Sequence, residues 1–190
     1  MTFQIIENII PVNQQNLIED RFLGSNFPLY LNDRSVHLDN LTAFSDENTK
    51  DGYRLNHYFV KEGKLTSNEW SLIEPIALAL VTKLGLEPKI ASCKLNINFP
   101  DPSFTDKDHF PPHYDTTDRA IVAIYYVNEA DGDTLFFNRN EKAGTFELTA
   151  SLRPQKGMLV YFDNTVLHAN KPPKLANIRC VINFNFLLDY

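Results

Sequence analysis

The sequence predicts a mainly β protein with flanking helices. Short apolar or alternating runs recur about every 8–12 residues through the second half of the chain, and turn residues separate them. Aromatic residues make up 12% of the chain, with 14 Phe and 8 Tyr, which favours strands over a helical bundle. The 190 residues suit a single domain, with a helical and mixed support region over residues 1–90 and a β core over residues 91–190.

The first helix is expected between Pro11 and Gly24. Apolar residues recur between them at helical spacing, and a proline before a helix and a glycine after it are typical of its two ends. Residues 27–31 favour an extended segment. Residues 33–52 are polar and favour irregular structure.

A second helix is expected to open at Thr66 and to continue until Gly85. Thr66 and Glu69 offer a capping box at its start, because the glutamate lies three residues after the threonine. Trp70 begins an apolar face at helical spacing, so its indole is expected in the core rather than in a ligand site. Pro75 either kinks this helix or lies in its first turns.

Eight short strands are expected after residue 90, with no long helix between them. This pattern predicts an antiparallel sandwich, a jelly roll or a barrel. The segments between the runs contain the Gly, Pro and Asp residues that favour turns. The expected strands are Ser92–Phe99, Phe110–Thr116, Ala120–Asn128, Thr134–Asn138, Thr145–Leu152, Met158–Asp163, Val166–Asn170 and Ile178–Leu188.

Charge and hydropathy exclude several classes of function. The formal net charge is −6 and lysine and arginine do not cluster, which argues against a nucleic-acid partner. No apolar run approaches the ~20 residues of a membrane span, and the first residues lack a secretion-signal pattern. Cys93 and Cys180 lie in apolar segments, so we expect buried free thiols rather than a disulfide, and a cytoplasmic location.

Three residues are candidate metal ligands. His113 and Asp115 are two positions apart, so on a strand both side chains leave the same face, about 6–7 Å apart along the backbone. His168, in another expected strand, is the third candidate. Two imidazoles and one carboxylate suit a non-haem Fe(II) oxygenase, and zinc accepts the same ligands. The other histidines lack such neighbours and are expected on the surface or in loops: His37, His57 and His109.

Alternation along the last expected strand separates two kinds of residue. Every second residue from Cys180 to Phe186 is apolar and should pack against the N-terminal helices. The other face begins at Arg179, continues with Val181 and two asparagines, and should line the interior of the barrel. A buried arginine needs an anionic partner, which a substrate carboxylate would supply. The other interpretation is that Arg179, at the start of the strand, points into water.

Taken in order, His113-x-Asp115, His168 and Arg179 resemble the signature of the Fe(II)/2-oxoglutarate-dependent dioxygenases, most closely their prolyl-4-hydroxylase-like branch. The resemblance extends over residues 91–188. It includes strand 120–128, the acidic glycine turn and strand of residues 131–137, and the approach to the second histidine over residues 154–162.

The resemblance implies a double-stranded β-helix core, of the jelly-roll or cupin-like kind, and a role for each signature residue. His113, Asp115 and His168 would hold Fe(II), and Arg179 would bind the far carboxylate of 2-oxoglutarate. The hydroxyl of Tyr126 matches a family position that reaches the same carboxylate, and a packed core aromatic is the other interpretation. Ascorbate is a candidate reductant.

One position departs from the family pattern. Phe99 replaces a tyrosine with which some prolyl hydroxylases contact 2-oxoglutarate, and Asn96 or Asn98 could compensate for the missing hydrogen bond. Related halogenases replace the carboxylate ligand by a small residue. The intact Asp115 therefore argues for hydroxylation.

The implied function is hydroxylation of an unactivated C–H bond, with release of succinate and CO₂, by an Fe(II)- and 2-oxoglutarate-dependent dioxygenase. The substrate is left open among a prolyl or other amino-acid residue and a small molecule. Two alternatives remain: a cupin-type isomerase or hydrolase that does not use O₂, and a non-enzymatic jelly-roll binding domain. Neither gives Arg179 or Tyr126 a task. The polar, proline-bounded segment Asp101–Pro112 is expected to form a mobile flap over the site.

Overall fold

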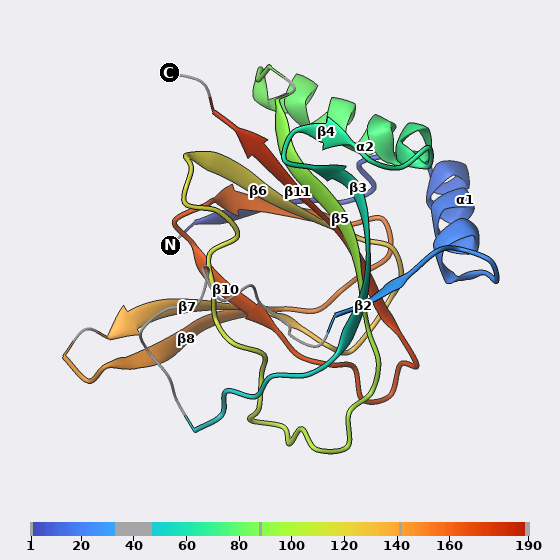
Figure 1. Ribbon diagram of the computed structural model, residues 1–190. Helices are drawn as coiled ribbons and strands as arrows, with labels where there is room; N and C mark the ends of the chain where they lie inside the picture. Colours follow the sequence, from blue (N-terminus) through green and yellow to red (C-terminus); the bar gives the residue numbers. More distant parts are fainter. Residues whose placement is uncertain (1, 33–46, 88, 141, 189–190) are drawn as a thin grey trace.

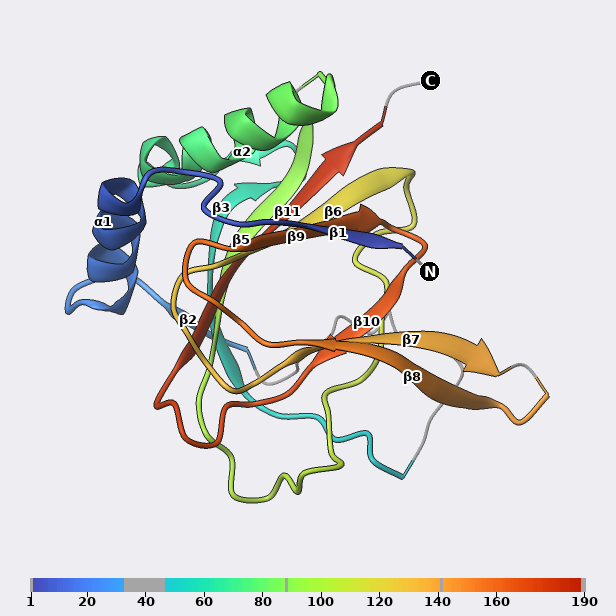
Figure 2. The same ribbon diagram turned by 180° about the vertical axis from the view of Figure 1, so that it is seen from behind.

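The computed structural model describes residues 2–32, 47–87, 89–140 and 142–188. Within these residues, two antiparallel sheets lie face to face, and both helices lie on the outer side of the larger sheet (Figure 1; Figure 2). The helices are α1 (Val12–Leu23) and α2 (Trp70–Leu84). The larger sheet has the order β1 (Phe3–Ile6), β9 (Leu159–Asp163), β6 (Ala120–Tyr126), β11 (Arg179–Leu187), β5 (Ile90–Asn98), β3 (Arg54–Lys61) and β2 (Tyr30–Asn32), with β4 (Lys64–Leu65) paired to β3. The smaller sheet has the order β10 (Leu167–Asn170), β7 (Thr134–Asn140) and β8 (Thr145–Leu152).

The main core lies between the larger sheet and the helices, and it determines which face of β11 points inward. Each large apolar side chain that is fully buried in this core stabilises the fold by about 1.5–3 kcal/mol, so the apolar face of β11 packs there. The opposite face of β11, which begins at Arg179, consequently points between the sheets. Four alternate residues of β11 are buried in this core, as the sequence pattern predicts: Cys180, Ile182, Phe184 and Phe186. The helices contribute Ile18, Phe22, Ile73, Ile76 and Leu80.

Both predicted helices are present, but α2 starts later than the expected opening at Thr66, and the expected capping box is wrong. The helix begins at Trp70, and the Glu69 side chain accepts hydrogen bonds from Arg21 of α1 instead of returning to the backbone. The hydroxyl of Thr66 donates to a carbonyl of β3. Ser67 Oγ accepts a hydrogen bond from the Glu69 backbone amide at 3.2 Å. This bond satisfies an amide at the start of the helix that has no partner within the helix. A contact with α1 and a local bond to Ser67 therefore replace the expected capping box.

Seven of the eight expected strands are present among the described residues, with ends that differ by a few positions. The exception is Phe110–Thr116, which makes an isolated bridge between His113 and His168 rather than a strand. Pro111 and Pro112 carry no N–H groups, so this segment lacks donors for a regular ladder. The region expected to be mainly support also contributes β1 and β3 to the larger sheet, and sequence analysis did not identify either strand.

Two histidines that were expected on the surface or in loops are buried. His57 lies on β3, and its two ring nitrogens are 2.9 Å from a backbone carbonyl oxygen and 2.8 Å from Ser67 Oγ. His109 lies in a loop, as expected, but its ring packs on Phe137 and is hidden from solvent. Both rings are covered by residues distant in the chain, which neighbouring sequence does not reveal. His37 lies outside the described residues.

Both cysteines are buried and unpaired, as expected. Neither helix of the described residues combines the length and the apolar character needed to cross a membrane.

Candidate metal centre and active site

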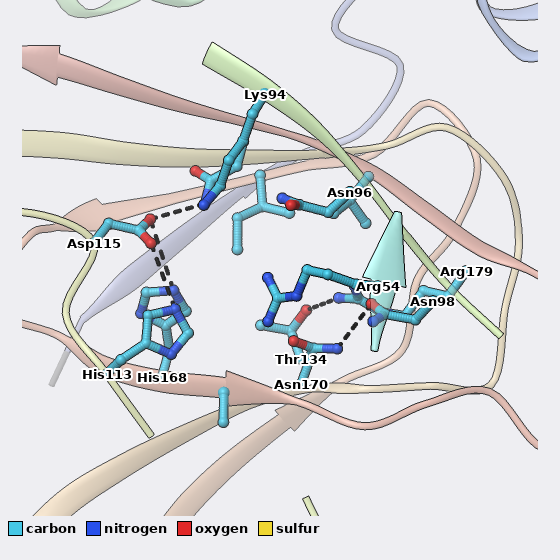
Figure 3. Close-up of a pocket in the computed structure, with 14 residues that line it drawn as sticks. Arg54, Lys94, Asn96, Asn98, His113, Asp115, Thr134, His168, Asn170 and Arg179 are labelled. Carbon is cyan, nitrogen blue, oxygen red and sulfur yellow. Dashed lines mark hydrogen bonds and ion pairs between the residues drawn. The ribbon is translucent and has the colours of Figure 1, made fainter. Parts of the chain in front are cut away.

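His113, Asp115 and His168 lie together between the two sheets (Figure 3). Their ligand atoms lie within 4.8 Å of one another. Asp115 Oδ1 is 3.5 Å from His113 Nε2, and Asp115 Oδ2 is 3.8 Å from His168 Nε2. Backbone hydrogen bonds in both directions between His113 and His168, at 2.9 and 3.2 Å, hold the two imidazoles side by side. The sequence-predicted triad is therefore assembled around one point.

The two imidazoles present their Nε2 atoms to that point. Nδ1 of His113 lies 3.0 Å from the carbonyl oxygen of Pro111, and Nδ1 of His168 lies 3.2 Å from that of Val166. Because a carbonyl oxygen only accepts, each Nδ1 donates its proton there, and Nε2 is the ring nitrogen that remains to bind a metal ion. A histidine that binds a metal ion through Nε2 requires this tautomer.

The third ligand is held by a neighbouring strand and is ionised. Asn183 of β11 donates from Nδ2 to Asp115 Oδ2 at 2.9 Å. Burial would raise the pKa of Asp115, but its contact with His113 and the charges of His168, His113 and Lys94 hold that pKa well below its usual range. Burial lowers the pKa of His168 to about 4. An anionic carboxylate and a neutral imidazole are the protonation states that a divalent metal ion needs, so these residues fit Fe(II).

The other end of the pocket is built around the hydroxyl of Thr134 on β7. Arg179 donates from Nη2 to Thr134 Oγ1 at 2.9 Å and from Nε to the carbonyl oxygen of Gly132 at 2.6 Å. Tyr126 donates from its hydroxyl to the same Thr134 oxygen at 2.8 Å. Arg179 is only 2% exposed, which excludes the interpretation that it points into water. No carboxylate of the described residues lies within ion-pair distance of its guanidinium.

The pocket connects the triad to Arg179. Asn96 and Asn98, whose direction the sequence left open, both line it, and Asn98 Oδ1 accepts from Asn170 Nδ2 at 3.1 Å. Phe99 is largely exposed and lies outside the pocket wall. The ring of Tyr126 lies behind Thr134 and does not line the pocket.

Sequence reasoning missed four polar lining residues: Arg54, Lys94, Thr134 and Asn170. Thr134 follows the acidic glycine turn, and alternation along β7 could have placed its side chain inside. Arg54 gave no such signal, because its position depends on the pairing of β3 with β5.

The segment Asp101–Pro112, expected to be a mobile flap, is attached to the rest of the protein by Lys50, Lys171 and Lys174. Lys50 donates to Asp108 Oδ2 at 2.7 Å, and Lys171 donates to the carbonyl oxygen of Asp106 at 2.6 Å. Two phenylalanines of the segment are also buried. Mobility remains a prediction, and these are contacts that an opening motion has to break.

The sequence of the β core matches a known family. Residues 102–187 match the family model described as the 2OG-Fe(II) oxygenase superfamily, where 2OG denotes 2-oxoglutarate. This region contains the triad, Thr134 and Arg179. No protein of curated function matches the chain.

Several solved structures share the fold over nearly the whole chain. An oxidoreductase of the 2OG-Fe(II) oxygenase family from Burkholderia pseudomallei has a TM-score of 0.65 at 11% identity, over 96% of this chain and 84% of that one. The collagen prolyl hydroxylase of Paramecium Bursaria Chlorella virus-1, solved with 2-oxoglutarate, has a TM-score of 0.60 at 11% identity, over 98% and 97%. A prolyl-4-hydroxylase from Pseudomonas putida has a TM-score of 0.55 at 18% identity, over 98% and 92%.

At these identities the likeness shows the fold, with antiparallel sheets packed as in the double-stranded β-helix of 2OG oxygenases. The triad and the family together imply Fe(II) and 2-oxoglutarate. The match over residues 102–187, the triad and the fold together make the 2OG-Fe(II) oxygenase superfamily the family that this β core resembles.

Proposed function

We propose that the protein is a hydroxylase that acts on an unactivated C–H bond. The observation that carries the proposal is one polar pocket with the metal triad at one end and the Arg179–Thr134 pair at the other. When bound, Fe(II) and 2-oxoglutarate supply the oxidising chemistry: one oxygen atom of O₂ enters the succinate that forms with CO₂, and the other enters the substrate C–H bond.

The triad holds the ion in this proposal. His113, Asp115 and His168 supply three ligands, which leaves coordination positions open for the cosubstrate and for oxygen. Asn183 orients the carboxylate, and the two carbonyl partners of the Nδ1 atoms fix the imidazoles. The site is therefore organised before the ion binds.

Arg179 and Thr134 bind the far carboxylate of 2-oxoglutarate in this proposal. Thr134 Oγ1 already accepts two hydrogen bonds, so its own hydrogen is available to a group in the pocket. The remaining N–H groups of Arg179 and this O–H would then meet one carboxylate. Tyr126 acts here through Thr134, as a positioning residue, and not by touching the cosubstrate.

Three further features complete the proposal. Residues 1–90 support the core within one domain, because both helices pack on the larger sheet and β3 extends it. The unpaired buried cysteines suit the reducing cytoplasm. Ascorbate is the reductant that we would include in assays. Prolyl hydroxylases are among the proteins that share the fold, which favours amino-acid substrates, free or in a peptide.

Stoichiometric turnover tests the proposal. The Fe(II)-loaded protein, given O₂ and candidate substrates, should release one succinate for each substrate hydroxylated, and the zinc-loaded protein should release none. Activity of the zinc form, or substrate conversion without consumption of 2-oxoglutarate, would favour a cupin-type enzyme that does not use O₂.

A further inference from the structure

Arg54 lines the pocket but has no hydrogen-bond partner there. The residue is only 7% exposed, and its buried Nε and Nη2 atoms have no acceptor among the described residues. Figure 3 shows its guanidinium directed into the pocket, between the triad and Thr134. Burial lowers the pKa of Arg54 to about 10, so the group stays charged at neutral pH. A buried charge with unpaired donors destabilises a protein unless something binds it.

The surrounding protein compensates this charge only in part. The carboxylates of Asp51 and Asp115 favour the charged form, but neither accepts a hydrogen bond from Nε or Nη2. The guanidinium of Arg179 opposes it. The ring of Phe110 lies 5.9 Å from the guanidinium carbon, which is a non-directional contact. The directional donors of Arg54 therefore remain available to a ligand.

The charge of 2-oxoglutarate can be balanced without Arg54. Fe(II) with Asp115 keeps one positive charge and Arg179 adds a second, and together they balance the two carboxylates of 2-oxoglutarate. Arg54 is a cation in excess of that balance, and Lys94 lies on the same pocket wall. The filled site therefore favours one further anionic group.

The register of the sheet places a second unused donor beside Arg54. Arg179 is opposite Asn98 across β11 and β5, and Leu55 is opposite Ile97 across β3 and β5. Arg54, Asn98 and Arg179 consequently follow one row across three strands. Asn98 Nδ2 is buried and has no acceptor among the described residues, whereas Asn98 Oδ1 accepts a hydrogen bond from a neighbour. Adjacent donors without acceptors suit a carboxylate, which only accepts when ionised.

We propose that Arg54 and Asn98 bind a carboxylate of the primary substrate, and that this substrate is a small organic acid, such as a free amino acid or hydroxy acid, rather than an internal residue of a peptide. The proposal rests on the proposed function, because the charge balance assumes that Fe(II) and 2-oxoglutarate occupy the rest of the pocket.

The stability of the metal-free protein, without any acid in the buffer, gives a test that needs no substrate. Arg54→Met removes the unpaired charge and keeps a side chain of similar length, so the melting temperature should rise by about 3–8 °C. Arg21→Met is the matched control, since Arg21 is partly exposed and bonded to Glu69, and its loss should not raise the melting temperature. A lower melting temperature for Arg54→Met would overturn the proposal, because Arg54 would then support the fold.

Binding to the Mn(II)-loaded protein, which does not turn over, tests the ligand. The probes are 2-oxoglutarate and then a panel of free amino, hydroxy and dicarboxylic acids, each compared with its methyl ester by calorimetry. Arg54→Met should bind 2-oxoglutarate within about threefold of wild type. At least one acid should bind wild type about 10- to 100-fold more tightly than its ester, and the variant should lose this preference.

Two binding results would overturn the proposal. Equal binding of acids and esters by wild type would show that no carboxylate is recognised. A loss of 2-oxoglutarate affinity in Arg54→Met as large as in Arg179→Ala would assign Arg54 to the cosubstrate. Failure of the proposed function would differ from both, because wild type itself would not bind 2-oxoglutarate.

Discussion

Replacing Thr134 by valine should destabilise the protein strongly for so small a change. Thr134 Oγ1 accepts hydrogen bonds from the Tyr126 hydroxyl at 2.8 Å and from Arg179 Nη2 at 2.9 Å. All three residues are at most 2% exposed, so water cannot replace the lost acceptor. Valine keeps the shape and leaves two buried donors unpaired. At about 1–3 kcal/mol for each unpaired donor, Thr134→Val should lower the free energy of unfolding by about 2–6 kcal/mol.

The same geometry predicts coupling between Thr134 and Tyr126. Tyr126→Phe removes one donor and should cost about 1 kcal/mol. In the double variant the hydrogen bond between these two residues is absent from both sides, so only Arg179 remains unpaired. The double variant should therefore be more stable than the sum of the single effects predicts, by about 1 kcal/mol.

Urea unfolding of the metal-free protein measures these quantities. Wild type, both single variants and the double variant give the coupling energy, and Thr165→Val is a matched control at an exposed position, expected to change stability by less than about 0.5 kcal/mol. The reasoning would be refuted if the two changes were additive within about 0.3 kcal/mol. A Thr134→Val variant as stable as the Thr165→Val control would refute it equally.

Four further predictions concern the metal, the cosubstrate, pH and the flap. His168→Ala should not retain one equivalent of Fe(II) after anaerobic dialysis, because two ligands hold the ion too weakly, and full iron content would contradict the triad. Affinity for 2-oxoglutarate should fall by roughly 30- to 1000-fold in Arg179→Ala, less in Arg179→Lys and least in Tyr126→Phe, with Fe(II) affinity nearly unchanged. Calorimetry measures these affinities, and a different order of the variants would argue against binding of the 2-oxoglutarate carboxylate by Arg179. Between pH 6.5 and 4, His168 takes up a proton in the unfolded chain but not in the folded protein. The metal-free protein should therefore lose up to about 3 kcal/mol of stability as the pH falls through this window. Urea midpoints measure the loss, and the pH dependence should be smaller in His168→Gln. Hydrogen exchange in Asp101–Pro112 should slow when cosubstrate and substrate bind, and strong protection in the free enzyme would contradict a mobile flap.

Local sequence patterns predicted those elements in which apolar and polar positions recur at a regular spacing along the chain. The alternation in β11 predicted both of its faces, because a strand in the middle of a sheet has one face on the apolar core and one on the polar pocket. The strand at Thr145–Leu152 was predicted with the residue bounds that the structure has. The triad was predicted from residue types and order, since chemistry restricts the possible ligands of Fe(II) far more than it restricts a packed surface.

One error had a local cause, and the others arose where distant segments decide the outcome. The ligand segment at His113 was expected as a strand, and the prolines before it leave an isolated bridge. Glu69 was expected in a capping box, and an arginine on another helix binds it instead. The position of Arg54 in the pocket follows from the pairing of β3 with β5, which no pattern in residues 1–90 indicated. Such contacts form only when the sheet assembles.

The central claim is that one pocket binds Fe(II) at the His113, Asp115 and His168 triad and binds 2-oxoglutarate between that triad and Arg179. Titration of 2-oxoglutarate into the Fe(II)-loaded protein without oxygen tests it most directly, because the iron complex of this cosubstrate has a weak visible charge-transfer band. Wild type should develop the band to saturation at one equivalent per chain, and Arg179→Ala should need at least about 30-fold more 2-oxoglutarate. Absence of the band in wild type, or an unchanged titration in Arg179→Ala, would contradict the claim.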